Sequence, residues 1–393
     1  MDPLEDLRTV GASLWGDADI AVGPPPPGAH CQVHDEQYVA VPSAQRPRFL
    51  VSADLGPTAT SRLLREYNSL RATGPRLARA GLALLAGLGW SAGTSSRRVQ
   101  VHHRDLDDTG LRGFLARELG RDPHTIALAC GVRVAHGIAR PIVTVADRRG
   151  RPLLFVKLAG TALHQRRLRN EYEMLGALAD RRLPGFHTPA PAFWRHWNGH
   201  ALLAVEPLPR EVEPLRPRDA GYTARALASL TTERIPHAVG DSPWLHSLRR
   251  RAGHVAPADR ERVTAGIDRV VDLAGDVVLP HDVGHGDWSF WNMAHLPSSG
   301  RVALWDWEFG HPRAPRGLDE LHWDYAVATT IRGVPAPRVV ARQRDLHDGR
   351  GPAARTVRVL HTLDMATRLY ENATLGDADA AATAHRLLDT VPG

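Results

Sequence analysis

Three short apolar segments in the middle of the chain have the composition of β-strands. Apolar runs bounded by turn residues are typical of strands in a sheet. The predicted strands cover residues 125–134, 141–147 and 152–159, and Arg-Arg-Gly at 148–150 forms a tight hairpin turn between the last two. Another apolar strand is predicted at 201–209, and its terminal prolines suit a hinge between two lobes.

Helical periodicity follows these strands and dominates the second half of the chain. Residues 162–181 place four large side chains on one helical face: Leu168, Tyr172, Leu175 and Leu178. A similar apolar stripe occupies 262–275, and further helices are predicted near 318–330, 356–371 and 378–390. The fold class is therefore α+β, with a small β-rich amino-terminal lobe and a larger helical carboxy-terminal lobe.

The first hundred residues carry no motif to which chemistry can be assigned. Residues 1–30 are expected to be loosely ordered and end in a proline run that predicts a stiff spacer. Residues 38–53 predict a hairpin, and a helix is expected from Thr58. We expect three parts, which are an amino-terminal extension with a hairpin and helices (1–108), the β-rich lobe (109–207) and the helical lobe (208–393).

Composition narrows the class of protein only slightly. The chain is 43% hydrophobic and 23% charged, as an ordinary globular protein is. Its two cysteines, Cys31 and Cys130, form no disulfide framework, and the first ten residues lack the features of a secretion signal, so a cytoplasmic location is expected. The net charge of +6 comes from scattered arginines, so neither nucleic acid nor a membrane is an expected partner. The oligomeric state is left open.

Lysine is almost absent from this chain. Of its 49 basic residues 48 are arginine, and the one lysine is Lys157, near the end of the strand predicted at 152–159. An ammonium group is compact, whereas a guanidinium is a planar fork, so a retained lysine suggests a site where the two are not equivalent. The following helix offers Glu171 and Glu173 as partners. In kinases, a strand lysine contacts the nucleotide phosphates, and a helix glutamate holds that lysine in place.

A group of polar side chains gathers between residues 283 and 310. Residues 285–292 read HGDWSFWN and residues 305–308 read WDWE, with a predicted hairpin between them. Folding this hairpin brings Asn292 and Asp306 together beside Asp287. Two carboxylates and an amide oxygen make a hard-oxygen site suited to Mg²⁺. Phosphoryl transfer needs such metal ligands and a carboxylate that orients the attacking hydroxyl.

These motifs together resemble a known family. HGDWSFWN followed by WDWE resembles the HGDxxxxN…DxE signature of aminoglycoside phosphotransferases and their choline-kinase-like relatives. Upstream, FVKLA and LRNEYEML resemble the nucleotide lysine and the helix glutamate of the same family. The resemblance covers roughly residues 110–330 and implies a bilobal protein-kinase-like fold that binds ATP and Mg²⁺ between its lobes.

The resemblance also implies roles for the residues of the second lobe. Asp287 would be the catalytic base, and His285 would brace the catalytic loop. Asn292 and Asp306 would be the magnesium ligands. The implied reaction moves the γ-phosphate of ATP to a hydroxyl group of a small molecule.

In the first lobe, the resemblance implies that Lys157 anchors the phosphates and that Glu171 is its ion-pair partner. Glu206 would lie at the hinge, where backbone groups meet adenine. The chain departs from the usual pattern in its phosphate loop, which has only Gly131 and Gly137 and no GxGxxG run.

Other interpretations stay open at this point. A kinase acting on serine or threonine in a peptide would share the nucleotide-side residues, and a pseudokinase-like module would only bind the nucleotide. A metal-dependent hydrolase would leave Lys157 and Glu171 without a task. A zinc site is not expected, because His281, His285 and His295 do not have the H-E-x-x-H spacing.

Two features of the motif region have competing interpretations. Four tryptophans, at 288, 291, 305 and 307, either form a substrate platform or pack in the interior, and their alternation favours packing. Asp319 either caps a helix or contacts the substrate.

Overall fold

The computed structural model describes most of the chain as two compact units. The described residues are 4–23, 36–43, 47–66, 80–81, 83–87, 98–102, 110–181, 183, 185–230 and 234–391. The first unit comprises Met1–Tyr172 and Pro189–Glu213, and the second comprises Glu173–Thr188 and Pro214–Gly393. Among the described helices none is long and apolar enough to cross a membrane.

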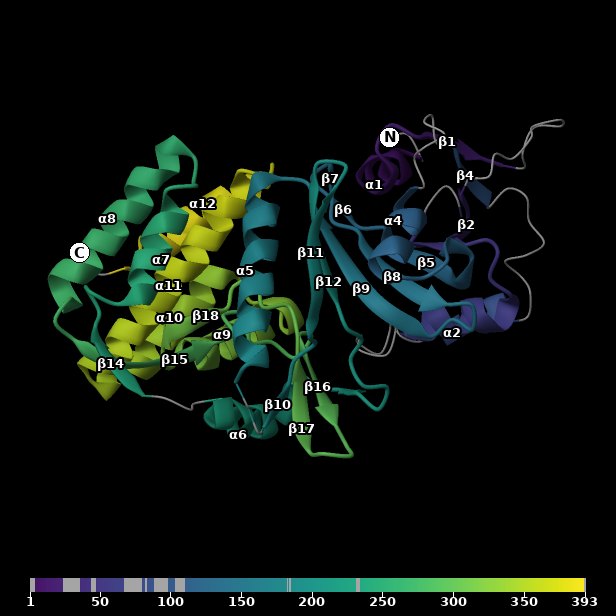
Figure 1. Ribbon diagram of the computed structural model, residues 1–393. Coiled ribbons are helices and arrows are strands. Elements are labelled where there is room, and N and C mark those ends of the chain that lie inside the picture. Colours follow the sequence, from purple (N-terminus) through teal and green to yellow (C-terminus); the bar gives the residue numbers. More distant parts are fainter. Residues whose placement is uncertain are drawn as a thin grey trace. The chain divides into compact units, whose positions relative to one another are not determined.

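An antiparallel sheet forms the first unit (Figure 1). The described part of the chain contributes nine strands, which in order across the sheet are β1 (Asp19–Val22), β4 (Arg98–His102), β2 (Glu36–Val41), β3 (Phe49–Ser52), β5 (Ile126–Gly131), β8 (Ile142–Asp147), β9 (Pro152–Ala159), β12 (His200–Val205) and β11 (Pro191–Trp197). The strands predicted from the sequence at 141–147 and 152–159 are confirmed, and those at 125–134 and 201–209 are confirmed in shorter form.

The first hundred residues belong to this sheet. The predicted hairpin at 38–53 is confirmed as β2 and β3, and β3 in turn pairs with β5 through Leu50 and Cys130. The expectation that residues 1–30 are loosely ordered is wrong, because α1 (Glu5–Trp15) and β1 are regular elements. Leu7, Val10 and Leu14 have helical spacing and are buried, so packing against the sheet orders this segment. The proline run that follows lies outside the described residues.

Helices cover both faces of the sheet. On one face α1 and α4 (Gly110–Glu118) share a hydrophobic core with the sheet, and on the other face α2 (Pro57–Glu66) does so. Alternate side chains of β2 enter the two cores, with Tyr38 and Ala40 in the first and Val39 and Val41 in the second. This alternation is the two-residue period of a strand that is buried on both sides.

Short elements connect the strands that precede Lys157. A 3-10 turn (Pro123–Thr125) leads into β5, and the two-residue strands β6 (Val134–Ala135) and β7 (Ile138–Ala139) form a small hairpin. At its tip His136 and Gly137 have φ values of 51° and 74°, which is the left-handed backbone of a tight hairpin turn. After β9, α5 (Ala162–Ala179) confirms the helix predicted at 162–181.

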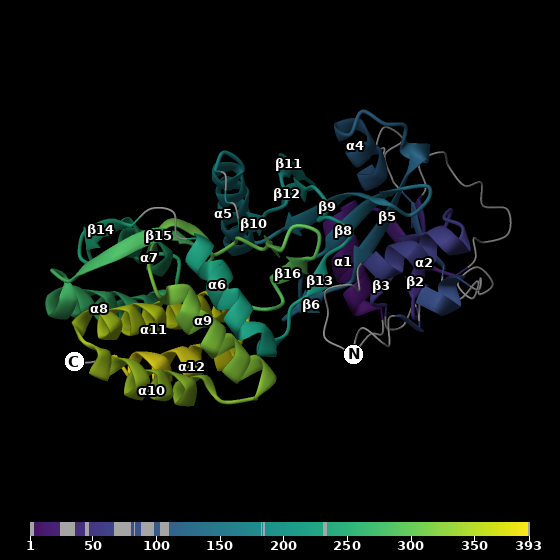
Figure 2. The same cartoon turned by 90° about the horizontal axis from the view of Figure 1, so that it is seen from below.

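Helices form most of the second unit (Figure 2). They are α6 (Ala220–Leu230), α7 (Pro243–Ala252), α8 (Pro257–Ala274), α9 (Leu318–Ala326), α10 (Ala336–His347), α11 (Pro352–Ala373) and α12 (Ala378–Leu388), with 3-10 turns at Pro217–Asp219 and Asp348–Arg350 and a π-helical turn at Val327–Ile331. The predicted helices near 318–330, 356–371 and 378–390 are confirmed, and so is the division into a β-rich part and a helical part. Helix α11 is buried almost throughout its middle and forms the centre of this core.

Two small groups of strands hold the motif region within the second unit. In one, β15 (Val278–Gly284) pairs with β14 (Ile235–Ala238) and β18 (His311–Pro315). In the other, β16 (Met293–Leu296) and β17 (Arg301–Leu304) form the hairpin predicted from the sequence, and β10 (Phe186–His187) pairs with β17. The two-residue strand β13 (Glu213–Pro214) spans the end of the first unit in the sequence. Residues 285–292 thus run from β15 to β16.

Candidate active site

An ion pair joins Lys157 on β9 to Glu171 on α5. The Nζ atom of Lys157 lies 2.7 Å from both carboxylate oxygens of Glu171. The Glu171 side chain is 2% exposed and that of Lys157 is 20% exposed, whereas Glu173 is exposed on the same helix. Charge-assisted hydrogen bonds in a partly buried setting are the strong kind, so the ammonium group has a fixed position.

Glu206 lies immediately after β12, in the first unit. Its side chain is exposed, and its backbone N–H donates to the carbonyl of Ala190. The β12–β9 register pairs Leu203 with Lys157 and Val205 with Phe155. Glu206 therefore directly follows β12, which pairs with β9, the strand that carries Lys157.

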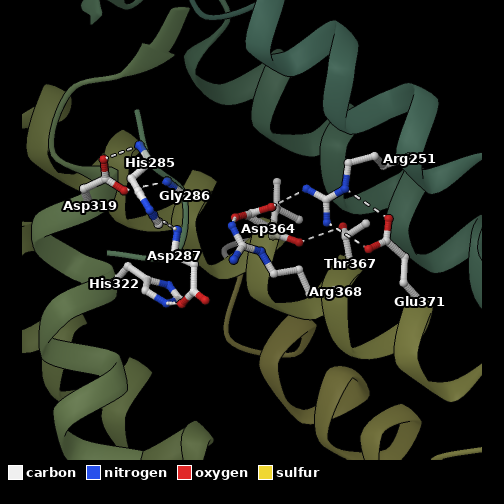
Figure 3. Close-up of polar contacts among 11 residues, drawn as sticks. Arg251, His285, Gly286, Asp287, Asp319, His322, Asp364, Thr367, Arg368 and Glu371 are labelled. Atoms are coloured by element: carbon white, nitrogen blue, oxygen red, sulfur yellow. Dashed lines mark hydrogen bonds and ion pairs between the residues drawn. The ribbon is translucent and has the colours of Figure 1, made fainter. Parts of the chain in front are cut away.

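In the second unit, Asp319 supports the loop that contains Asp287 (Figure 3). Its two carboxylate oxygens accept hydrogen bonds of 2.8 Å from the backbone N–H groups of His285 and Gly286. Gly286 has a φ of 77°, and a Cβ atom there would lie 2.2 Å from the carbonyl oxygen of Phe309. The backbone at this point therefore requires glycine, which explains the central residue of HGD.

The buried ring of His285 links this loop to the segment before Asp306. Its Nε2 lies 3.0 Å from the carbonyl oxygen of Trp305, and its Nδ1 accepts from the backbone N–H of Asp287. This pattern requires the tautomer with hydrogen on Nε2. Burial lowers the pKa of His285 despite the nearby carboxylates of Asp319 and Asp287. A neutral ring at this position joins the two parts of the motif.

The carboxylate of Asp287 is held by two side chains. Its Oδ1 lies 2.8 Å from Nε2 of His322, and its Oδ2 accepts a hydrogen bond of 2.8 Å from the amide of Asn292. Burial alone would raise the pKa of Asp287, but the hydrogen bond from His322 and the charge of the Arg368 guanidinium outweigh it and lower the pKa. Asp287 is therefore ionised at neutral pH.

Asn292 and Asp306 stand at the same end of the β16–β17 hairpin. The backbone N–H of Trp305 donates to the carbonyl of Asn292, which extends the ladder of this hairpin by one bond. Asp306 has a φ of 67°, an uncommon value for a residue with a side chain, and such backbone strain clusters at functional sites.

The oxygen donors of Asn292 and Asp306 fit Mg²⁺. This ion is usually bound by one or two protein groups and takes its other ligands from phosphates and water. Within the described ranges, no three or more histidine, cysteine, aspartate or glutamate side chains are arranged to hold a metal ion. Two oxygen donors are fewer than a metal site made by the protein alone would need, so the remaining ligands of a bound ion would have to come from phosphates and water.

Sequence analysis left two supporting residues unassigned. Asp319 is not the cap of α9, whose N-cap is Gly317, but the acceptor for two loop N–H groups. His322 received no role, although it lies three residues after Asp319 and so shares its helical face. The three-residue spacing from Asp319 could have indicated that His322 faces the same loop.

A network of charged side chains lies on α7 and α11 (Figure 3). Arg251 lies 2.6 Å from Asp364 and 3.0 Å from Glu371, and Asp364 also pairs with Arg368. The Arg368 guanidinium stacks 3.9 Å from the ring centroid of Phe309. The Arg251 and Arg368 charges lower the pKa of Asp364, although its burial acts the other way. The sequence offered no signal for this network.

A pocket opens between this network and the loop. It is small, with a cavity volume of about 30 Å³, and its walls include Trp244, Phe309, Asp319, His322, His361 and Asp364. All of these residues belong to the second unit.

Burial decides between packing and a substrate platform for two of the four tryptophans of the motif. Trp288 is 1% exposed and Trp307 is fully buried, so the packing interpretation is confirmed for these two. Trp288 packs edge-on against Phe186, and Trp307 packs against His285. Trp291 and Trp305 are partly exposed.

Comparisons with solved structures find small-molecule kinases. A fructosamine-3-kinase from Haemophilus somnus is 12% identical, with a TM-score of 0.43, and the match covers 72% of this chain and 97% of that one. An ethanolamine kinase from Plasmodium vivax is 9% identical, with a TM-score of 0.45 and coverage of 74% and 89%. An aminoglycoside phosphotransferase from Streptomyces rimosus, solved with ADP and streptomycin, is 16% identical, with a TM-score of 0.34 and coverage of 57% and 89%. No protein-family model and no curated protein matches the sequence.

Proposed function

We propose that the chain is an ATP- and magnesium-dependent phosphotransferase that transfers the γ-phosphoryl group to a hydroxyl group of a small molecule. The observation that carries this proposal is the setting of Asp287. Its carboxylate is ionised, partly exposed, and fixed by hydrogen bonds from His322 and Asn292. Each carboxylate oxygen has a second lone pair, so Asp287 can still accept a hydrogen bond from an acceptor hydroxyl.

The other residues of the second unit serve the metal and the loop. Asn292 and Asp306 would hold Mg²⁺, which neutralises charge on the β- and γ-phosphates when it is bound. His285 braces the catalytic loop through its contacts with Trp305 and Asp287. In this proposal residues 208–393 are the lobe that carries out the chemistry.

The first unit would bind the nucleotide. Lys157, held by Glu171, would contact the α- and β-phosphates, and the backbone near Glu206 would receive the adenine. Residues 109–207 are the nucleotide lobe in this proposal, and residues 1–108 extend its sheet. The low cysteine content suits a reaction in the cytoplasm.

The chemical step is an in-line displacement at phosphorus. The acceptor oxygen forms a bond to the γ-phosphorus, the bond from that phosphorus to the bridging oxygen breaks, and ADP leaves with the electron pair. The hydroxyl proton passes through Asp287 to solvent. Because the pKa of Asp287 is lowered, this carboxylate orients the hydroxyl more than it removes the proton early.

A mass-spectrometric screen of hydroxylated metabolites and aminoglycosides, with ATP and Mg²⁺, tests the proposal. We expect one acceptor to gain a phosphate, and Asp287→Asn to lower kcat by about a thousandfold or more while nucleotide affinity is retained. Asp272→Asn, an exposed substitution of the same kind on α8, is the control. Full turnover by Asp287→Asn, or the absence of magnesium-dependent ATP binding, would overturn the assignment.

A further inference from the structure

The hairpin of β6 and β7 lies between β5 and β8, where a kinase has the glycine-rich loop that covers the nucleotide phosphates. Such loops bind anions through backbone N–H groups that have no partner in the protein. In this chain two of the loop donors already have partners. The N–H of Val132 lies 3.0 Å from the carbonyl oxygen of Arg48, and the N–H of Arg140 lies 3.1 Å from that of Arg133. These bonds favour side chains over backbone as the phosphate ligands.

Helix α1 holds this hairpin in place (Figure 1). It packs against both β6 and β7. Val132 and Ala139 belong to the same hydrophobic core as Leu7 and Val10, and Val134 packs against that core. The hairpin is therefore ordered by the amino-terminal helix before any ligand binds, and a ligand that binds to an ordered loop does not have to supply the free energy of ordering it.

Two arginines lie opposite each other on the other face of the hairpin. Val132 and Val134 face the core under α1, so Arg133 between them faces away from it. Ala139 belongs to the same core, so Arg140 also faces away. The register that pairs Val134 with Ala139 places the two exposed arginines directly across from each other. Like charges in such a pair destabilise it, and a bound anion would offset their repulsion.

Lys157 lies on the same face of the sheet as these arginines. Its neighbours Val156 and Leu158 belong to the core under α1, so the lysine side chain is on the opposite face. Its cross-strand partner on β8 is Ile142, which follows Arg140 by two residues and therefore shares its face. Strand geometry puts the Cα atoms of Arg140 and Lys157 about 8 Å apart.

The first turns of α5 lie close to the charge of Arg140. The pKa of His164 is lowered to about 4 by its burial and by the positive charges of Arg140 and Arg167. Arg167 precedes Glu171 by four residues, so it shares the helical face that contacts Lys157. Positive charge from the hairpin, from β9 and from α5 therefore gathers at one end of the Lys157 strand.

We propose that Arg133 and Arg140 form a polyphosphate site that extends the Lys157 site and takes the place of a glycine-rich loop. A guanidinium group binds phosphate through two parallel N–H donors, so the opposed arginines suit the terminal phosphates of a nucleoside triphosphate. The nucleotide in this proposal comes from the phosphotransferase function proposed above. The site would make the chain select triphosphates over monophosphates.

Calorimetric titration of the full chain with ATP, ADP and AMP, with Mg²⁺ and without an acceptor, tests the site. We expect Arg133→Gln and Arg140→Gln each to weaken ATP binding by about tenfold or more, because each variant loses a charged hydrogen-bonding group. ADP should lose less affinity, and AMP should bind all forms equally. Arg151→Gln is the matched control, since Arg151 is an exposed arginine at the end of β9 away from Lys157, and it should leave every affinity unchanged.

Stability separates the loss of a phosphate ligand from damage to the hairpin. Removing one of two opposed like charges should leave the free energy of unfolding of the ligand-free chain unchanged or raise it. Unchanged ATP affinity in both variants, or an equal loss of affinity for ATP and AMP, would overturn the proposal.

Inorganic tripolyphosphate, titrated in the same way, separates this site from the proposed function. Binding of tripolyphosphate that both variants weaken, without binding of ATP, would defeat the nucleotide assignment and support the arginine site. ATP binding and phosphate transfer that neither variant changes would support the phosphotransferase and defeat the arginine site. An unaltered chain that binds neither probe would contradict both.

Discussion

The Nε2 atom of His322 lies 2.8 Å from Oδ1 of Asp287, so the carboxylate proposed to orient the acceptor is held by α9. The same helix carries Asp319, whose carboxylate oxygens accept hydrogen bonds from the backbone N–H groups of His285 and Gly286, the two residues before Asp287. One helical face thus fixes both the backbone and the side chain of the loop. We therefore expect substitutions on α9 to change the rate of phosphoryl transfer without changing the affinity for the nucleotide.

Replacing His322 tests whether its hydrogen bond positions Asp287. We expect His322→Leu to lower kcat by about 10- to 100-fold with the KM for ATP unchanged, because a small displacement of a reacting group has effects of this size. His322→Gln keeps an amide donor and should recover part of the loss. The acid limb of the pH–kcat profile should also move to higher pH in His322→Leu, because burial then raises the pKa of Asp287 without the opposing hydrogen bond. An unchanged profile would contradict a positioning role.

Replacing Asp319 tests the support of the loop backbone. Asp319→Ala leaves the buried N–H groups of His285 and Gly286 without their acceptor, at roughly 1–3 kcal/mol for each group. We therefore expect the free energy of unfolding in urea to fall by about 2–6 kcal/mol. Glu320→Gln is the control, since Glu320 is the exposed neighbour on the same helical turn and should change stability by less than about 0.5 kcal/mol. Equal stabilities of the two variants would refute this role.

The single lysine allows a sharp substitution test. We expect Lys157→Arg to weaken ATP binding by about tenfold or more, because the longer, planar guanidinium can still pair with Glu171 but does not place a compact ammonium where the Lys157 Nζ atom lies. The reverse exchange at an exposed turn residue, Arg149→Lys, should leave ATP affinity unchanged. Titration of ATP by calorimetry in the presence of Mg²⁺ measures both. Normal ATP affinity in Lys157→Arg would show that the site needs only a positive charge.

His361 should make the protein less stable in mild acid. Its pKa in the folded state is lowered to about 3, whereas an unfolded histidine has a pKa near 6.5. Between these values the unfolded chain binds a proton that the folded chain does not, so stability falls as pH falls. His361→Leu should remove up to about 1.4 kcal/mol of this loss per pH unit below pH 6.5. Urea unfolding of both proteins at pH 7 and pH 5 measures the difference, and parallel losses would contradict the expectation.

Local patterns were enough to predict the elements around the proposed site. Three such elements are the strand that carries Lys157, the helix that carries Glu171 and the hairpin between Asn292 and Asp306. In each, the apolar and turn residues within the element itself indicate its structure. These segments are short in sequence, so periodicity and turn residues specify them without knowledge of distant contacts.

Contacts between distant segments could not be predicted in this way. Arg251 and Asp364 are 113 residues apart, and no local pattern connects them. The error at residues 1–30 has a related cause. The helix at Glu5–Trp15 contains Gly11 and weak caps, so its order comes from burial of Leu7, Val10 and Leu14 against a sheet whose strands come later in the sequence.

The pairing of β3 with β5 has a consequence for any shortened form of this protein. If residues 1–108 were removed, β5 would become an open edge with a row of unpaired backbone groups, and α1 would no longer cover the apolar side chains of the sheet. Such an edge pairs readily with other chains. A fragment that begins near residue 109 should therefore aggregate on expression, even though every motif residue is retained. We therefore expect the first hundred residues to prevent aggregation of the rest of the chain by pairing with β5 and covering the sheet.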